Sequence, residues 1–150
     1  MNIGLLGGGQ LGLMMIKAAK KLKHKVIVLD TDKNCPASQV CDNLIVGEYG
    51  ESSKLNLLAE NCHTFTVETE NVPIKTLNYL SNFGPVRPSA DSVSICQNRI
   101  KEKNFISSIG VPVVPYFEIQ AEDDLNKIPY DLPPSILKTA QFGYDGKGQI

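Results

Sequence analysis

Short apolar runs alternate with stretches of helical periodicity along the first part of the chain. The runs have the length and composition of buried strands, and they cover residues 3–6, 26–30, 44–46 and 64–67. The stretches between and after them predict three helices: one over residues 10–22, one that Ser52 or Ser53 caps, and one that Pro73 opens and that runs through Phe83. Strands that alternate with helices in this way imply a parallel sheet. The pattern therefore predicts an α/β fold with a doubly wound, Rossmann-like sheet.

The first predicted helix carries an apolar stripe. Its members recur three and four residues apart, as the positions on one side of a helix do: Leu11, Met14, Met15, Ala18, Ala19 and Leu22. We expect this stripe to pack on the sheet and the four lysines around it to face solvent.

The pattern changes in the last third of the chain. One polar helix is predicted over residues 91–109, followed by an extended segment at 111–115, an acidic turn and a strand at 135–138. The sequence stops at Ile150, within what looks like a β-hairpin. We therefore expect an N-terminal piece of a longer protein.

Composition and charge exclude several classes of protein. Hydrophobic residues make up 42% of the chain and charged residues 21%, which is typical of a packed globular core. The net charge of −1 argues against a strongly basic nucleic-acid-binding surface and against attraction to an anionic membrane. The sequence shows neither a signal peptide nor an apolar run long enough to span a membrane, so a cytoplasmic location is expected. The four cysteines lie in no metal-binding spacing and are expected to be reduced thiols.

The first candidate site is the glycine loop at residues 7–12, which fits the pattern G-x-G-x-x-G. It lies between a predicted strand and a predicted helix, where glycines let the backbone approach an anion and the helix offers free N–H groups. With Asp30 at the end of the second strand, this loop is compatible with an NAD site. A tight turn that binds no ligand fits the same residues.

A second glycine loop lies near the end of the chain. Three glycines and Lys147 fall within residues 143–149, and Lys138 lies on the predicted strand before them. Such a loop can fold its N–H groups over phosphates, and an inward-facing lysine on the strand would need an anionic partner. The spacing is not that of a Walker loop. An exposed hairpin tip without a ligand is the alternative.

Four segments together resemble one known family. They are residues 7–12, residues 68–73 (Glu-Thr-Glu-Asn-Val-Pro), residues 97–103 with Gln97-Asn98-Arg99, and Lys138 with residues 143–149. In this order they resemble the N-terminal part of the N5-carboxyaminoimidazole ribonucleotide synthases, which are ATP-grasp enzymes of purine biosynthesis. The resemblance covers essentially the whole chain, and its last segment is the most specific. Thr69 and Asn98 depart from the family, which usually has an aromatic residue and Asp at these positions.

The resemblance implies two domains and two groups of site residues. Residues 1–98 would form a Rossmann-like domain that precedes the ATP-grasp domain, and residues 99–150 would be the beginning of the ATP-grasp domain. Aminoimidazole ribonucleotide would bind at Gln10, Leu11 and Glu70. ATP would bind at Arg99, Lys138, Gly143, Tyr144, Asp145, Gly146, Lys147, Gly148 and Gln149. The acids that bind Mg²⁺ are expected beyond residue 150, so no metal ligand or catalytic residue is assigned within the chain.

The activity that the resemblance implies is a carbon–nitrogen ligation. The family uses ATP and bicarbonate to make carboxyphosphate and carboxylates aminoimidazole ribonucleotide, releasing ADP and phosphate. A homodimer and small-molecule substrates are implied, without nucleic acid or membrane, and the 150-residue chain alone is expected to be inactive. The alternatives are another ATP-grasp carboxylase, a formate-dependent glycinamide ribonucleotide transformylase, an NAD-dependent oxidoreductase and a non-catalytic nucleotide-binding module.

Overall fold

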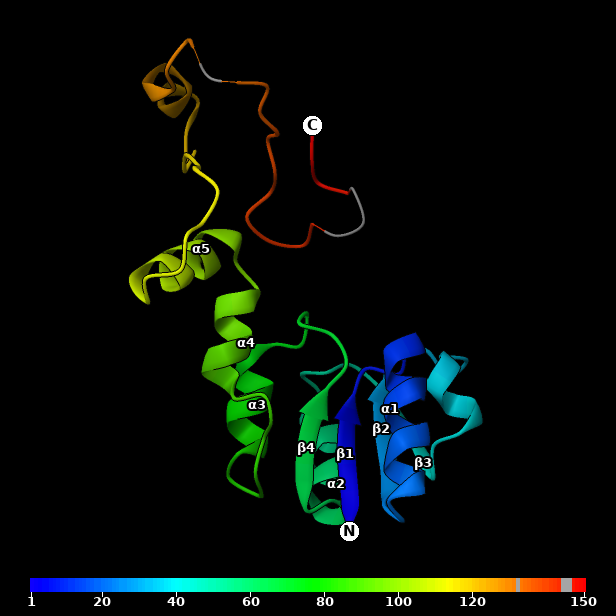
Figure 1. The fold of residues 1–150 in the computed structure, drawn as a ribbon. Coiled ribbons are helices and arrows are strands. Elements are labelled where there is room, and N and C mark those ends of the chain that lie inside the picture. Colours follow the sequence, from blue (N-terminus) through cyan, green and yellow to red (C-terminus); the bar gives the residue numbers. More distant parts are fainter. Residues whose placement is uncertain (132, 144–146) are drawn as a thin grey trace. The chain divides into compact units, whose positions relative to one another are not determined.

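The computed structural model describes residues 1–131, 133–143 and 147–150. The chain divides into two compact units, Met1–Ser94 and Ile95–Ile150. Four parallel strands form the sheet of the first unit: β1 (Asn2–Leu6), β2 (Lys25–Asp30), β3 (Asn43–Val46) and β4 (Thr64–Val67). Their order in the sheet is β3-β2-β1-β4 (Figure 1). This arrangement confirms the α/β fold with a Rossmann-like parallel sheet.

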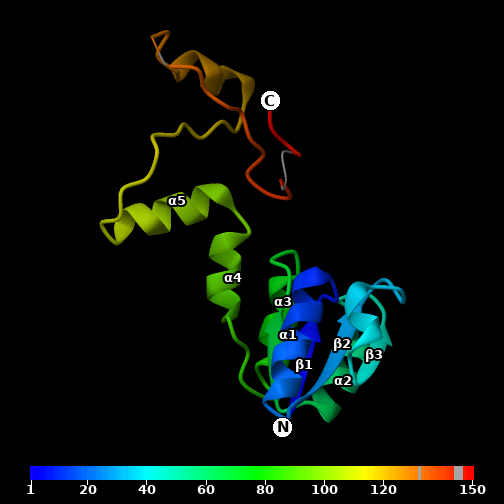
Figure 2. The same cartoon turned by 45° about the vertical axis from the view of Figure 1, so that its right-hand side comes forward.

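Helices cover both faces of this sheet (Figure 2). They are α1 (Gln10–Lys21), α2 (Ser52–Asn61), α3 (Ile74–Leu80) and the short 3-10 helix η1 (Pro36–Gln39), and α4 (Ala90–Cys96) begins in the same unit. On one face, Leu5 and Val28 of the sheet share a core with Ile16 of α1. On the other face, the larger core joins Leu6 and neighbouring strand residues to α2 and α3. Successive strand residues thus enter opposite cores, as the period of two in a strand requires.

The prediction that the apolar stripe of α1 packs on the sheet is wrong. Leu11 is 59% exposed, Met14 62% and Leu22 70%, whereas Ile16 is completely buried. The buried face is formed by Gly12 and Ile16, with Ala19 partly buried. Gly12 lies so close to the sheet that a Cβ atom there would come within 3.0 Å of the Gly7 carbonyl oxygen. Close packing of the helix on β1 therefore selects the small residue and not the adjacent large ones.

Two predicted helix starts also differ from the structure. Glu51, not Ser52 or Ser53, occupies the N-cap of α2, and Ser53 Oγ instead donates to Glu51 Oε1 at 2.7 Å. Pro73 is the N-cap of α3 rather than its first residue, and Phe83 lies beyond the end of that helix.

The single helix predicted over residues 91–109 is two helices. The first, α4, ends at Cys96, and the second unit begins its own helix α5 at Arg99–Ser108. Asn98 separates them because its extended backbone places its side chain to accept from the N–H groups of Ile100 and Lys101, both at 3.0 Å. An Asn cap of this kind competes with a continuous helix.

The rest of the second unit contains little regular structure. The acidic turn is part of the 3-10 helix η2 (Glu122–Lys127). In place of the strand predicted over residues 135–138, an isolated antiparallel bridge joins Lys138 to Gln149, with Leu137 and Ile150 exchanging both backbone hydrogen bonds. This supports the hairpin expected at the end of the sequence. Among the described residues, none of the helices has the length and apolar character needed to cross a membrane.

Truncation of a side chain on the buried face of α1 should cost much more stability than truncation on its exposed face. Ile16→Ala should lower the free energy of unfolding by about 2–5 kcal/mol, because it opens a cavity in a closed core. Met14→Ala, two residues earlier on the exposed face, should change it by less than about 0.5 kcal/mol. Urea unfolding followed by circular dichroism measures both. Equal losses in the two variants would contradict the observed helix orientation.

Candidate functional site

The order of the strands marks the carboxyl ends of β1 and β4 as a candidate ligand site. The chain leaves β1 toward β2 and β3 on one side, while β4 pairs with β1 on the other side, so the connections diverge between β1 and β4. Ligands of open α/β sheets bind at such a divergence. The first glycine loop follows β1, and the acidic segment beginning at Glu68 follows β4. Both candidate segments of the first unit therefore lie at the same sheet edge.

Asp30 holds the first glycine loop at this edge. Its carboxylate is largely buried, at 8% exposure, and accepts the Gly8 N–H at 2.6 Å and the Asp32 N–H at 2.8 Å. The carbonyl oxygen of Gly8 in turn accepts the Ala37 N–H at 2.8 Å. In a dinucleotide site, the acid at the end of the second strand would bind a ribose hydroxyl. Here the Asp30 carboxylate is occupied by the protein's own N–H groups.

Glu68 lies across the glycines of the same loop. A Cβ atom on Gly7 would come within 2.8 Å of Glu68 Oε2, and one on Gly9 would collide with Glu68 Oε1. A Cβ atom on Gly12 would lie 3.5 Å from Glu68 Cγ. The three glycines of the pattern thus form a groove for this half-buried side chain. A carboxylate near the N-terminus of α1 interacts favourably with the helix dipole, and it would repel a pyrophosphate.

The residues predicted to bind the nucleotide substrate lie around this groove. Gln10 is the first residue of α1 and is exposed, and Leu11 beside it is 59% exposed. Glu70 is exposed in the segment after β4, where the Asn71 N–H donates to Thr69 Oγ1 at 3.2 Å. All three therefore lie at the β1–β4 edge, Gln10 and Leu11 in the first turn of α1 and Glu70 in the loop after β4, and all three are exposed.

Tyr49 is a residue of this edge that the sequence analysis missed. It follows β3, is half-buried, and its hydroxyl donates to Asp30 Oδ2 at 3.4 Å. Burial raises the pKa of the Tyr49 phenol above its usual value of 10, and the nearby Asp30 charge raises it further. The phenol therefore remains a hydrogen-bond donor at neutral pH. A single tyrosine in a predicted loop gave no signal of this role, because its partner is nineteen residues away in the sequence.

In the second unit, the structure brings two predicted ATP-binding residues together. The Arg99 guanidinium donates from Nη2 to the Gly143 carbonyl oxygen at 2.9 Å, and the Arg99 N–H donates to the Ala140 carbonyl at the same distance. Thr139 fills the space beside the loop, because a Cβ atom on Gly148 would come within 2.5 Å of Thr139 Oγ1. Gly148 also has a φ of +68°, a conformation that favours glycine. Thr139 was not predicted as part of this loop.

The other predicted ATP-binding residues are more open. Lys138, Lys147, Gly148 and Gln149 are exposed, so the inward orientation expected for Lys138 is not observed in this chain. Tyr144, Asp145 and Gly146 lie outside the described residues. The start of α5 and the second glycine loop nevertheless meet through the contact between Arg99 and Gly143.

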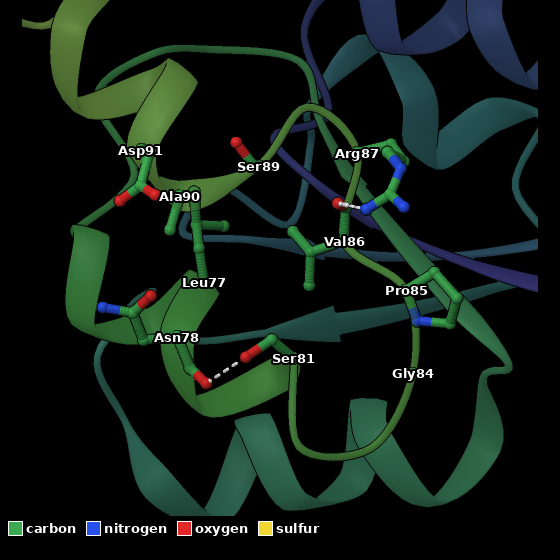
Figure 3. Close-up of a pocket in the computed structure, with 10 residues that line it drawn as sticks. All are labelled: Leu77, Asn78, Ser81, Gly84, Pro85, Val86, Arg87, Ser89, Ala90 and Asp91. Atoms are coloured by element: carbon green, nitrogen blue, oxygen red, sulfur yellow. Dashed lines mark hydrogen bonds between the residues drawn. The ribbon is translucent and has the colours of Figure 1, made fainter.

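A pocket of about 390 Å³ in the first unit involves different residues (Figure 3). It is lined by α3, the segment that follows it and the start of α4: Leu77, Asn78, Ser81, Gly84, Pro85, Val86, Arg87, Ser89, Ala90 and Asp91. None of the predicted substrate-binding residues lines it. Among the residues that the structure describes, no group of three or more His, Cys, Asp or Glu side chains could hold a metal ion.

Comparisons with known proteins agree with this architecture. Residues 1–97 match the family model of the ribonucleotide synthetase preATP-grasp domain. An N5-carboxyaminoimidazole ribonucleotide synthase of Staphylococcus aureus is 37% identical over 150 residues, and one of Staphylococcus epidermidis is 39% identical. Each alignment covers 99% of this chain and 40% of the relative, so the chain spans about 40% of the length of these relatives.

Solved structures show the same similarity in three dimensions. The S. aureus N5-carboxyaminoimidazole synthetase complexed with ADP matches with a TM-score of 0.93 at 37% identity, over 99% of this chain and 40% of that one. The Aspergillus clavatus enzyme in complex with ADP and 5-aminoimidazole ribonucleotide matches with a TM-score of 0.83 at 28% identity, over 99% and 39%. Since the family model covers most of the chain and the observed sheet carries its glycine loop at the expected edge, the chain belongs to the ribonucleotide synthetase preATP-grasp family.

Proposed function

We propose that this chain provides the N-terminal part of an ATP-dependent ligase that carboxylates 5-aminoimidazole ribonucleotide. In the proposed reaction, ATP phosphorylates bicarbonate to carboxyphosphate, and carboxylation of the substrate amine then gives N5-carboxyaminoimidazole ribonucleotide, ADP and phosphate. The observation that carries the proposal is the alignment of 99% of the chain, including both glycine loops, with N5-carboxyaminoimidazole ribonucleotide synthases. Relatives that were solved with ADP and with aminoimidazole ribonucleotide support the two substrates.

The first unit is proposed to hold the nucleotide substrate at the β1–β4 edge. Gln10 and Leu11 are accessible at the start of α1, and Glu70 is accessible after β4. Gln10 can donate to or accept from a small polar ligand, while Leu11 offers an apolar contact. The Glu68 carboxylate beside them can accept hydrogen bonds from hydroxyl or amine groups of the nucleotide.

The second unit is proposed to contact the phosphates of ATP. Phosphoryl transfer depends mainly on positioning and on neutralising charge, which Arg99, Lys138 and the loop 143–149 can supply. Arg99 already contacts Gly143, so a single side chain links the start of α5 to the loop. We place the boundary between the two domains at residues 98 and 99. Mg²⁺, which such a reaction uses, would be held by acids outside this chain, and a cytoplasmic homodimer is proposed from the family resemblance.

The NAD-dependent alternative is less well supported by the geometry. Gly8 N–H and the Asp30 carboxylate already bond to each other, and Glu68 fills the groove in which a pyrophosphate would lie. A formate-dependent transformylase or another ATP-grasp carboxylase would share both glycine loops. The resemblance of Gln10 and of the Glu70-Asn71-Val72-Pro73 segment to the N5-carboxyaminoimidazole ribonucleotide synthases favours the aminoimidazole substrate instead.

The protein should show no saturable binding of NADH. The Asp30 carboxylate and the Gly8 N–H are occupied, and the Glu68 carboxylate would repel the pyrophosphate. Titration of the chain with NADH, followed by nucleotide fluorescence, tests this expectation. Saturable binding that Asp30→Ala abolishes without loss of the circular dichroism signal would overturn the ligase assignment.

Lys138→Ala should reduce the ATP-dependent turnover of the complete enzyme. A preorganised charge at a developing phosphate contributes about a hundredfold or more to the rate. Lys147→Ala, in the glycine loop, should cost less. Lys101→Ala is a matched control, since Lys101 is an exposed lysine of α5 in the same unit. A kcat/KM for Lys138→Ala within about threefold of wild type would refute the assigned role.

Gln10→Ala should raise the KM for aminoimidazole ribonucleotide by about fivefold to tenfold, the value of one good hydrogen bond. The KM for ATP should remain nearly unchanged, because the proposed ATP contacts belong to the second unit. Gln39→Ala, at an exposed position of η1, serves as the control in steady-state assays of phosphate release. If Gln10→Ala raised only the KM for ATP, the proposed contact between Gln10 and aminoimidazole ribonucleotide would be wrong.

A further inference from the structure

We infer that Tyr49 is a positioning residue that fixes the first glycine loop through Asp30 and so determines where Gln10 meets the nucleotide substrate. This inference rests on the proposed function for its substrate. It adds a residue from β3's loop to a site otherwise built from the loops after β1 and β4.

The contact between Tyr49 and the loop passes through one atom. Oδ2 of Asp30 accepts both the Gly8 N–H, at 2.6 Å, and the Tyr49 hydroxyl, at 3.4 Å. Oδ1 of the same carboxylate accepts the Asp32 N–H at 2.8 Å. Three donors therefore hold the carboxylate, and the Tyr49 hydroxyl restrains the same oxygen atom that binds the Gly8 N–H.

The backbone of Tyr49 is itself held by a hydrogen bond from α3. Its carbonyl oxygen accepts the Thr76 hydroxyl at 2.6 Å, and Thr76 of α3 is only 1% exposed. A buried hydroxyl with a short hydrogen bond gives the Tyr49 backbone little freedom. A series of hydrogen bonds thus connects α3 to Gly8 through Tyr49 and Asp30.

Gly8 is also held on the side away from Asp30. Its carbonyl oxygen accepts the Ala37 N–H at 2.8 Å, and a Cβ atom on Gly8 would lie 2.5 Å from Cys35 Sγ. Cys35 is buried, at 3% exposure. The orientation of the Gly8 peptide is therefore set by Asp30 on one side and η1 on the other, and Gln10 follows two residues later at the start of α1.

Tyr49→Phe tests the inference because it removes the hydroxyl and keeps the ring. In the complete enzyme it should raise the KM for aminoimidazole ribonucleotide by about twofold to fourfold, because the bond that is lost is a long one. The KM for ATP and the unfolding midpoint should change little. In the 150-residue chain, amide hydrogen exchange measured by NMR should be faster at Gly8 in the variant than in the wild type.

Tyr79→Phe is the matched control. Tyr79 is also half-buried in the first unit, and its hydroxyl also donates to a side-chain oxygen, that of Asn56, on α2. It should leave both the KM for aminoimidazole ribonucleotide and the exchange at Gly8 unchanged.

The results separate the positioning role from the proposed function. If Tyr49→Phe, like Tyr79→Phe, left the KM and the exchange at Gly8 unchanged in an active enzyme, the positioning role would be overturned and the proposed function would stand. A complete wild-type enzyme without ligase activity would refute the proposed function, and with it the substrate role of Tyr49. Faster exchange at Gly8 would then support only the contact with the loop.

Discussion

The buried carboxylate of Asp30 is the contact around which the carboxyl edge of the sheet is arranged. A carboxylate at 8% exposure is stable only when donors compensate for its lost hydration, and Asp30 has three. The shortest of them is the Gly8 N–H, so the turn after β1 is fastened to the end of β2. Because α1 begins directly after this turn, the position of its first residue, Gln10, depends on the same contact.

The glycine pattern has a different use here from the one its spacing suggests. In a dinucleotide site, the missing side chains make room for a pyrophosphate. In this chain they make room for Glu68, which comes from the segment after β4 and lies across Gly7, Gly9 and Gly12. Loops after β1 and β4 therefore interlock at the point where ligands of open sheets bind.

Much of the fold could be predicted from local patterns, and the exceptions have identifiable causes. The four strands follow from short apolar runs that end near the residues where the structure ends them. The buried face of α1 was predicted wrongly because its apolar residues cover a wide arc, and periodicity alone does not show which part meets the sheet. Close contact with β1 and the turn after it decides this, since a Cβ atom at position 12 would come within 3.0 Å of the Gly7 carbonyl oxygen. The break at Asn98 was missed because the polar sequence on both sides has helical propensity.

The sequence by itself determined the parallel α/β architecture and the two glycine loops, because strand length, helix periodicity and glycine spacing are local properties. It also supplied the residues that the resemblance assigns to ATP and to the nucleotide substrate. Only the tertiary structure decided which groups those residues meet. Asp30 with Gly8 and Tyr49, Glu68 with the glycines, and Arg99 with Gly143 are contacts between residues far apart in the chain. Such contacts arise when strands pair and helices pack, so no local pattern encodes them.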